Sequence, residues 1–220
     1  MDEADRLFEL GFVEQVDTVM SACTHRGLKR ALFSATMMQG VETLARTVLC
    51  DPVRLTIGAR NAATNSIKQE LLFVSSEDGK LLAFRQMIQR GLAVPLLIFV
   101  QSKERAQQLY NELVYDNLQV DVIHADRTQH QRTESIKKFR AGTVWILICT
   151  DLMARGIDFI GVNTVLNYDF PQSTVSYIHR IGRTGRAGRK GHAITFFTET
   201  DKVCSNMHIW ALGSGAGHAL

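Results

Sequence analysis

The most concentrated set of chemically active side chains is the segment His179–Arg186, which reads HRIGRTGR. It places three arginines and one histidine on two short turns spaced by glycines. Guanidinium groups at this density suit a polyphosphate whose negative charge grows during a reaction, because each planar fork donates several hydrogen bonds. A solvated basic loop, or a patch that binds the RNA backbone without chemistry, would use the same residues. The segment alone leaves these interpretations open.

Four other blocks give this segment its context. The chain opens with the acidic run Asp2–Asp5 (DEAD), carries Ser34–Thr36 (SAT), and holds Thr150–Asp151 shortly before Ala154–Asp158 (ARGID). In this order and spacing, the blocks resemble those of the DEAD-box family of ATP-dependent RNA helicases, from residue 1 to about residue 200. The resemblance implies an enzyme that couples ATP hydrolysis to RNA binding and local duplex unwinding.

The acidic run would hold the metal ion and the attacking water. By the resemblance, Asp2 holds Mg²⁺ through water, Glu3 orients and activates the attacking water, and Asp5 ties the site to neighbouring blocks. Mg²⁺ keeps much of its hydration, and phosphoryl transfer needs a hard oxygen ligand beside a separate base. The four residues alone would favour a simpler interpretation, an acidic helix start, because carboxylates stabilise the positive end of a helix.

The resemblance gives the arginine segment a direct role on ATP. Arg183 and Arg186 are expected on the γ-phosphate as arginine fingers, which are worth roughly 10³–10⁵ in rate. His179 and Arg180 are expected to link the two domains and the acidic run.

Ribose contacts and a coupling element follow from the same resemblance. Gly156 has no side chain, so a ligand can approach its backbone closely. Asp158 is expected to accept a hydrogen bond from a ribose hydroxyl, and the alternative is that it is a plain loop or cap residue. Ser34 and Thr36 would couple the nucleotide state to RNA unwinding through hydrogen bonds to the acidic run. Capping of the following helix by these hydroxyls is an equal alternative, and both can hold at once.

The RNA contacts are expected mainly where strands end, and they comprise Gln101, Ser102, Gln129, Arg132, Thr150 and Asp151. The stretch from Gln129 to Arg132 resembles a family Gln-x-x-Arg element that touches the RNA backbone. Phosphate and ribose contacts give affinity without reading sequence. The aromatic residues are expected at core positions, which leaves no exposed platform for base stacking: Phe99, Phe139, Trp145, Phe196 and Phe197. We therefore expect RNA binding with little sequence preference.

Composition excludes several classes of protein. With 220 residues, 45% of them hydrophobic, the chain can bury one large or two modest cores. The net charge of +3 does not by itself indicate nucleic-acid binding. The four cysteines and seven histidines show no zinc or redox spacing, and no apolar run approaches the length of a membrane span. An intracellular monomer without a signal peptide is expected.

Apolar runs and helical spacing alternate along most of the chain. Strands are predicted at 69–74, 96–100, 120–124, 144–149, 164–167 and 193–197, with helices between them at 79–90, 103–116, 132–141 and 174–181. Before them, the pattern predicts helices at 6–24 and 41–49 and strands at 29–33 and 53–57. This alternation predicts an α/β fold, a parallel sheet with helices on both faces, which the resemblance makes RecA-like. The ligand site should lie beyond the carboxyl ends of the strands.

The domain organisation combines this pattern with the resemblance. Residues 1–57 are interpreted as the C-terminal remnant of a first RecA-like, ATP-binding domain, 58–65 as a linker, 66–200 as a second RecA-like domain and 201–220 as a divergent tail. The chain has no Gly-x-x-x-x-Gly-Lys-Ser/Thr loop to cradle phosphates. We therefore expect that it begins late, lacks the P-loop and is inactive alone, although its parent hydrolyses ATP.

Two alternatives to a helicase stay open. One is a non-catalytic RNA- or protein-binding module that keeps the second domain, and a more distant one is a DNA helicase of the same superfamily. Within the family, 57–61 and 99–106 look similar to a eukaryotic subgroup that acts in nucleolar maturation of small-subunit ribosomal RNA, although His124–Arg127 (HADR) stands where many members have His-Gly-Asp-Met. The resemblance thus implies ATP and Mg²⁺ as cofactors, RNA and protein activators as partners, and the nucleus and nucleolus, or otherwise the cytoplasm, as the location.

Overall fold

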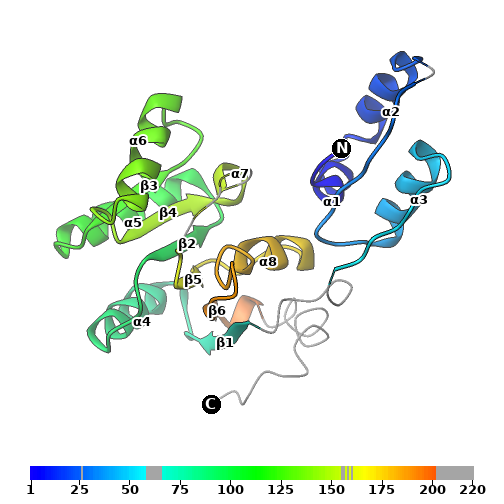
Figure 1. The fold of residues 1–220 in the computed structure, drawn as a ribbon. Coiled ribbons are helices and arrows are strands. Elements are labelled where there is room, and N and C mark those ends of the chain that lie inside the picture. Colours follow the sequence, from blue (N-terminus) through cyan, green and yellow to red (C-terminus); the bar gives the residue numbers. More distant parts are fainter. Residues whose placement is uncertain (26, 58–65, 155–156, 158, 160, 202–220) are drawn as a thin grey trace. The chain divides into compact units, whose positions relative to one another are not determined.

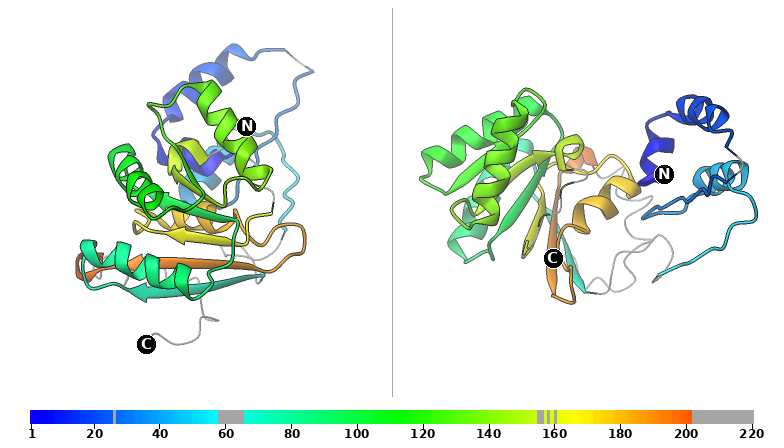
Figure 2. Two further views of the ribbon diagram at one scale, coloured as in Figure 1. Left: turned by 90° about the vertical axis from the view of Figure 1, so that its left-hand side faces the viewer. Right: turned by 45° about the horizontal axis from the view of Figure 1, so that its top comes forward.

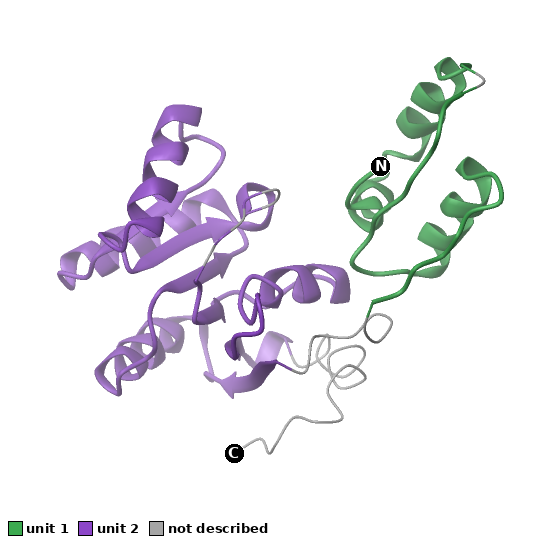
Figure 3. Cartoon of the chain, in the orientation of Figure 1, with its two compact units in different colours: residues 1–62 green, residues 63–220 purple. Residues whose placement is uncertain are grey.

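The computed structural model describes residues 1–201 except 26, 58–65, 155–156, 158 and 160 (Figure 1). The chain divides into two compact units, Met1–Ala62 and Ala63–Leu220 (Figure 3). The linker predicted at 58–65, and all but the first residue of the tail predicted at 201–220, lie outside the described residues. No helix within the described ranges is long and apolar enough to cross a membrane.

In its described part, the first unit contains the helices α1 (Ala4–Glu9), α2 (Val13–Ala22) and α3 (Gln39–Val48). The single helix predicted at 6–24 is wrong, because the chain turns between α1 and α2 at Gly11, whose φ of +75° lies in the left-handed region. Helix α1 packs on α3, and the apolar residues buried in this unit are Ala4, Val41, Leu44 and Val48.

The two strands predicted in the first unit are also wrong. Residues 29–33 are extended but form no strand, because they make isolated backbone hydrogen bonds instead of a continuous ladder. Phe33 N–H donates to the carbonyl oxygen of Met1 at 2.9 Å, and Ala4 N–H donates to that of Phe33 at 3.1 Å. Residues 53–57 are exposed and lie in no strand. The bonds of Phe33 nevertheless bring Ser34–Thr36 beside the start of α1.

A six-stranded parallel sheet forms the centre of the second unit (Figures 1 and 2). Its strand order is β1-β6-β5-β2-β4-β3, and each neighbouring pair runs parallel. The strands are β1 (Ile67–Phe73), β2 (Leu96–Val100), β3 (Val120–Ile123), β4 (Ile146–Thr150), β5 (Thr164–Asn167) and β6 (Gly191–Phe197). The predicted α/β fold is confirmed.

Helices cover both faces of this sheet: α4 (Glu77–Gln89), α5 (Lys103–Tyr115), α6 (Gln129–Arg140), α7 (Asp151–Ala154) and α8 (Thr174–Ile181). Successive residues of β2 point to opposite faces, so Ile98 packs with the α4 and α5 residues Phe84 and Leu109, while Phe99 packs with Phe139 of α6. Helix α8 packs through Ile181 and its neighbours on Ile67 and Ala193, near the β1 edge.

Four helices of this unit begin on a hydroxyl cap. Ser76, Ser102 and Ser173 accept hydrogen bonds from backbone N–H groups in the first turns of α4, α5 and α8. Thr128 and Gln131 form a reciprocal capping box at α6. Each cap follows a strand, so the turns that leave the carboxyl ends of the strands are held by their own hydroxyl groups. Two of the six predicted RNA contacts, Gln101 and Ser102, lie in these turns, and Gln129 follows the cap of α6 directly.

Candidate functional site

In the first unit, the acidic run and the SAT block are joined by hydrogen bonds. The Asp5 side chain is 2% exposed, and its Oδ2 accepts from Thr36 N–H at 3.0 Å and from Thr36 Oγ1 at 2.7 Å. Asp5 N–H donates to Ser34 Oγ at 3.2 Å, and Ser34 Oγ donates to the Thr36 carbonyl oxygen at 2.6 Å. A buried carboxylate with two donors is a stable anchor. The SAT block is thereby held against α1.

The capping alternative for the SAT block is wrong. Helix α3 begins after Met38, which makes no side-chain cap hydrogen bond, and neither Ser34 nor Thr36 reaches the first turn of α3. The acidic-helix alternative holds in part, because Asp5 lies in the first turn of α1.

Asp2 and Glu3 precede α1 in an unusual backbone conformation. Glu3 has a φ of +49°, in the left-handed region that a side chain with a Cβ rarely occupies, which costs about 1–2 kcal/mol. Asp2 is exposed, and its Oδ1 accepts a hydrogen bond from Glu3 N–H at 2.9 Å. No group of three His, Cys, Asp or Glu side chains within the described ranges could hold a metal ion. The Asp2 carboxylate is a hard oxygen donor that fits Mg²⁺ only with water and phosphate oxygens as the other ligands.

In the second unit, Arg180 is the most completely bonded arginine of the HRIGRTGR segment. It is 1% exposed, and its Nε and Nη2 donate to the two carboxylate oxygens of Asp151 at 2.7 and 2.9 Å. Its Nη1 donates to the Asp169 carbonyl oxygen at 2.7 Å, and the guanidinium lies 5.3 Å from the Phe99 ring centroid. These bonds all lie inside the second unit, and a link from Arg180 to the acidic run stays a prediction.

Asp151 is positioned by the same contacts. Besides the Arg180 fork, its Oδ2 accepts from Ser176 Oγ at 3.0 Å. These bonds tie α8 to the end of β4. An RNA contact of Asp151 stays a prediction. Thr150, the last residue of β4, is half-buried at the same edge.

Arg183 and Arg186 lie on the turn that follows α8. Arg183 is 8% exposed and donates from Nη1 to the Ile157 carbonyl oxygen at 3.0 Å, while the exposed Arg186 donates from Nε to the Gly182 carbonyl oxygen at 2.8 Å. His179 is half-buried in the last turn of α8. The candidate nucleotide residues Gly156 and Asp158 lie outside the described residues.

Small residues keep this turn close to the sheet. Gly185 has a φ of +68°, and a Cβ at this position would lie 2.7 Å from Ile67 Cγ1. A Cβ at Gly191 would lie 2.5 Å from the Gly185 nitrogen. The buried Thr184 hydroxyl reaches the Val162 carbonyl oxygen at 2.8 Å. The two candidate arginine fingers thus flank a turn that is fixed to its own unit.

The β2–α5 turn depends on a residue that the sequence analysis did not single out. Asp169 follows β5, is 3% exposed, and accepts Gln101 N–H at 2.9 Å and Lys80 Nζ at 3.1 Å. Arg105 donates to both of its oxygens, at 2.7 and 2.5 Å. Burial by itself would raise the pKa of Asp169, but the bonds from Arg105 and Gln101 and the charge of Lys80 lower it overall. The position of Asp169 two residues after the buried strand β5 could have identified it from the sequence.

The remaining RNA candidates lie just before α5 and in the first turn of α6. Gln101 and Gln129 are exposed, and Ser102 caps α5. Arg132 donates from Nη1 to Met153 Sδ at 3.1 Å, and its buried Nε has no hydrogen-bond partner among the described residues. Within the same part of the chain, neither ring nitrogen of the buried His124 has a partner, and burial, reinforced by the Arg127 charge, lowers the pKa of His124.

One aromatic prediction is wrong. Trp145 is 53% exposed because it precedes β4 and its indole Nε1 donates to the Gly142 carbonyl oxygen at 2.9 Å. Phe99, Phe139 and Phe196 are buried as predicted.

Comparisons with known proteins identify relatives of this arrangement. Residues 69–188, just over half of the chain, match the helicase conserved C-terminal domain. The chain is 57% identical over 202 residues to DEAD-box ATP-dependent RNA helicase 57 of Oryza sativa subsp. japonica, which covers 92% of this chain and 37% of that protein. It is 56% identical over 202 residues to ATP-dependent RNA helicase ROK1 of Scheffersomyces stipitis, covering 91% and 36%. The chain spans little more than a third of these curated relatives.

Solved structures are similar along nearly the whole chain. S. cerevisiae Dbp5 bound to RNA and ADP BeF3 is similar with a TM-score of 0.81 and 32% identity, over 93% of this chain and 55% of that chain. The yeast DEAD-box splicing factor Prp28 is similar with a TM-score of 0.62 and 30% identity, over 95% and 48%.

Proposed function

Since this chain belongs to the helicase conserved C-terminal domain family and to its DEAD-box branch, we propose that the whole protein couples ATP hydrolysis to RNA binding and local duplex unwinding. The observation that carries the proposal is the fork between Arg180 and Asp151. It joins the helix that leads into the candidate arginine fingers to the strand end that carries a candidate RNA contact. A movement of the turn that carries Arg183 and Arg186 would therefore be transmitted through α8 to the end of β4, where the RNA contact is proposed.

On the nucleotide, we assign the groups as follows. Asp2 would hold Mg²⁺ through water, and Glu3 would orient and activate the attacking water. Arg183 and Arg186 would stabilise the charge that develops on the γ-phosphate. Bound Mg²⁺ would neutralise charge on the phosphate oxygens. Gly156 and Asp158 are the proposed ribose contacts, assigned from the sequence alone.

The proposed coupling role falls to the hydrogen-bonded block of the first unit and to His179 and Arg180 of the second unit. A shift of Asp5 on hydrolysis would move Thr36, since a buried carboxylate does not leave its two donors without cost. Ser34 would follow through its bonds to the same block. This gives the SAT block a physical route from nucleotide state to RNA.

RNA would lie along the carboxyl edge of the sheet. The proposed contacts lie in the turn before α5, in the first turn of α6 and at the end of β4: Gln101, Ser102, Gln129, Arg132, Thr150 and Asp151. Such groups bind phosphate and ribose and read little sequence. The printed description of Dbp5 as bound to RNA and ADP BeF3 supports this for a relative of the same fold.

The cellular setting is proposed from resemblance. We propose that the protein acts as a monomer in nucleolar maturation of ribosomal RNA and that protein activators regulate it. A structure of Dbp5 bound to Gle1 supports the existence of such partners in a relative. We also propose the division into a first-domain segment at 1–57, a linker at 58–65, a second domain at 66–200 and a tail at 201–220.

An ATPase assay tests the function. The 220-residue chain contains no phosphate-cradling Gly-x-x-x-x-Gly-Lys-Ser/Thr sequence, so we expect no turnover from it alone, with or without RNA. The same chain joined after the N-terminal part of the rice relative should show ATP turnover that RNA stimulates. A joined protein that folds, binds ATP and RNA, and still fails to hydrolyse ATP would favour the alternative, a non-catalytic binding module.

A further inference from the structure

The backbone of Asp169 lies between β2 and α8. Asp169 follows β5 by two residues, and its N–H donates to the Phe99 carbonyl oxygen near the end of β2 at 3.2 Å. Its own carbonyl oxygen accepts from Arg180 Nη1 of α8 at 2.7 Å. The guanidinium of Arg180 in turn lies 5.3 Å from the Phe99 ring centroid. The arginine helix and the end of β2 are therefore joined through the backbone of this residue.

The carboxylate of Asp169 reaches the turn that follows β2. Its Oδ2 accepts from Gln101 N–H at 2.9 Å and from Arg105 Nε at 2.7 Å. Its Oδ1 accepts from Lys80 Nζ at 3.1 Å and from Arg105 Nη2 at 2.5 Å. Asp169 and Lys80 are 3% and 2% exposed, so water hardly competes for these bonds. A buried carboxylate with donors on both oxygens has one orientation, and this orientation fixes the position of Gln101 N–H.

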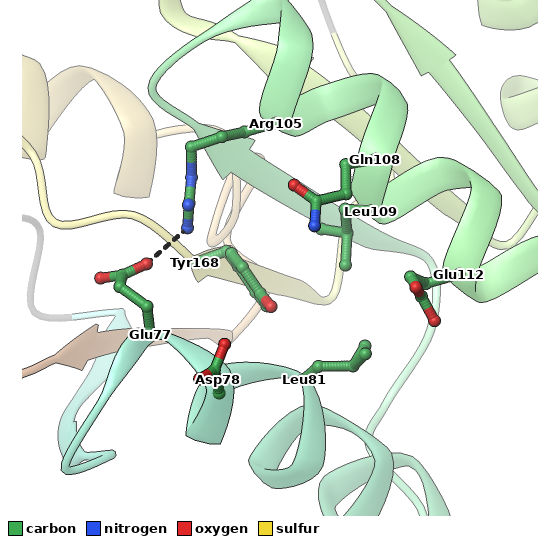
Figure 4. A pocket seen from close by; sticks show the side chains of 8 residues that line it. All are labelled: Glu77, Asp78, Leu81, Arg105, Gln108, Leu109, Glu112 and Tyr168. Atoms are coloured by element: carbon green, nitrogen blue, oxygen red, sulfur yellow. Dashed lines mark hydrogen bonds and ion pairs between the residues drawn. The ribbon is translucent and has the colours of Figure 1, made fainter.

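The charges of this network balance one another. Lys80 and Arg105 each form a second ion pair, with Glu77 at 2.7 Å in both cases. Figure 4 shows Arg105 of α5 and Glu77 of α4 meeting beside Tyr168. The Lys80 ammonium and the Arg105 guanidinium lie 5.8 and 5.9 Å from the centroid of the Tyr168 ring. Two cations matched by two carboxylates attract a phosphate weakly, so the network is better suited to holding a turn than to binding RNA itself.

We propose that Asp169 is a positioning residue for RNA binding, because it fixes the turn of Gln101 and Ser102 to the arginine helix. The inference rests on the function proposed above, which places RNA contacts in this turn. The bonds to Arg180 and to Gln101 belong to one residue, so the turn and α8 cannot shift apart without breaking one of them. The fork between Arg180 and Asp151 leads to the end of β4, and Asp169 adds a second connection, to the end of β2.

Two variants that differ only at residue 169 test this role. Lys80→Met/Asp169→Val replaces the buried ion pair by apolar side chains, which proteins often tolerate, and leaves Gln101 N–H without its acceptor. Lys80→Met alone is the matched control, because Asp169 keeps its bonds to Gln101 and Arg105. If the double variant does not fold, Asp169→Asn takes its place, with the parent as control and the same expectations. Its single amide oxygen cannot serve Lys80 and Gln101 together, and the buried ammonium is the costlier donor to leave unpaired.

Hydrogen exchange of the 220-residue chain, followed by nuclear magnetic resonance, measures the bond itself. In the double variant, Gln101 N–H should exchange at least about tenfold faster than in Lys80→Met, because a hydrogen bond to a charged acceptor is lost. The amide of Ile98, in the middle of β2, should change by less than about threefold. Equal rates for Gln101 in the two variants would overturn the proposal. An acceleration at Ile98 as large as that at Gln101 would also overturn it, because it would show a loss of overall stability only.

RNA binding measures the consequence. The probe is fluorescein-labelled oligouridine, and its fluorescence anisotropy is followed with the chain joined after the N-terminal part of the rice relative, in the presence of ADP and beryllium fluoride. The double variant should bind at least about fivefold more weakly than Lys80→Met. In a Gln101→Ala background the same comparison should give less than about twofold, because the side chain that Asp169 positions is absent. Equal affinities in the first comparison, or equal losses in the two backgrounds, would overturn the proposal.

This binding assay needs no ATP turnover, so the two proposals can fail separately. A joined protein that shows the expected differences in RNA affinity but does not hydrolyse ATP would refute the proposed function and leave the role of Asp169 standing. RNA-stimulated turnover together with an RNA affinity that does not depend on Asp169 would refute the role of Asp169 alone. A joined protein that binds no RNA would refute both.

Discussion

Replacing Arg180 by methionine isolates the contact on which the proposed coupling depends. Methionine keeps an apolar stem in the site but removes the fork to Asp151, the bond to the Asp169 carbonyl oxygen and the contact with the Phe99 ring. Arg180 is 1% exposed, so water cannot replace it without opening the core. The variant should therefore lose stability rather than only activity.

The size of the loss follows from burial on the two sides of the pair. Removing one partner of a buried ion pair costs about 3–5 kcal/mol. The Asp151 side chain is 31% exposed and can be rehydrated, which places the cost at the lower end of that range. The Asp169 carbonyl oxygen would also lose a donor. We expect a decrease of about 3 kcal/mol in the free energy of unfolding, which a urea slope of about 2 kcal/mol per molar converts to a midpoint lower by about 1.5 M.

Urea unfolding followed by circular dichroism measures this shift. Lys137→Met, on the exposed face of α6, is the matched control and should move the midpoint by less than about 0.3 M. Arg180→Lys should fall between the two, because it keeps the charge but loses the fork. A midpoint for Arg180→Met within about 0.3 M of the parent would refute the reasoning that this pair holds α8 to the end of β4.

Other contacts give further measurable outcomes. In the chain joined after the N-terminal part of the rice relative, Arg183→Ala should lower ATP turnover at least about 10³-fold while RNA binding partly survives, and unchanged turnover would remove Arg183 from the γ-phosphate. Gly185→Ala should destabilise the chain by more than Gly142→Ala, because both glycines have a positive φ but only a Cβ at Gly185 is crowded, at 2.7 Å from Ile67 Cγ1. Equal decreases in the free energy of unfolding, measured in urea, would show that crowding has no effect. The pKa of Asp169 is lowered on folding, so this group contributes stability above its unfolded pKa of about 3.9 and loses it as the pH falls through the folded value. Asp169→Asn should therefore flatten the acid limb of unfolding free energy against pH, and an unchanged limb would contradict the assignment. Thr36→Val should cost the first unit about 1–3 kcal/mol by leaving the buried carboxylate of α1 with fewer donors, and hydrogen exchange of the α1 amides should rise accordingly.

Sequence alone predicts the sheet of the second unit well. The strands Leu96–Val100 and Thr164–Asn167 and the helix Thr174–Ile181 have the predicted bounds, and the other predicted elements of this unit differ by a few residues. The short helix Asp151–Ala154 was not predicted. The central strands are continuous apolar runs because both of their faces are covered, so their pattern is unambiguous. Helix starts are less certain, since α4 and α6 begin directly after Ser76 and Thr128, two or three residues before the predicted helices.

The first unit shows where local patterns fail. The spacing of apolar residues at 6–24 fits one helix, but this spacing gives no information on the positive φ of Gly11, which ends the helix. The residues 29–33 have strand composition, yet a strand also needs a neighbour that pairs along its length, and only isolated bonds form there. The prediction that Trp145 is buried is wrong for a related reason, because a residue just before a strand is not constrained to point to one face of the sheet.

The polar network of the second unit was the least predictable part of the site. Asp169, Lys80, Arg105 and Gln101 are spread over ninety positions of the sequence, from 80 to 169, and no motif joins them. Their contact depends on β5 lying next to β2, which follows from the strand order and not from any local pattern. A prediction of that order would have placed Asp169 beside the Gln101 turn.

The three arginines of the HRIGRTGR segment have different surroundings, although the sequence presents them alike. Arg180 is 1% exposed and fully occupied by partners inside the second unit, Arg183 is 8% exposed and donates to a backbone carbonyl, and Arg186 is exposed. A guanidinium that is neutralised by a buried carboxylate is a poor partner for a phosphate. Arg180 therefore fixes the helix that leads into the turn, and Arg183 and Arg186 stay the proposed arginine fingers.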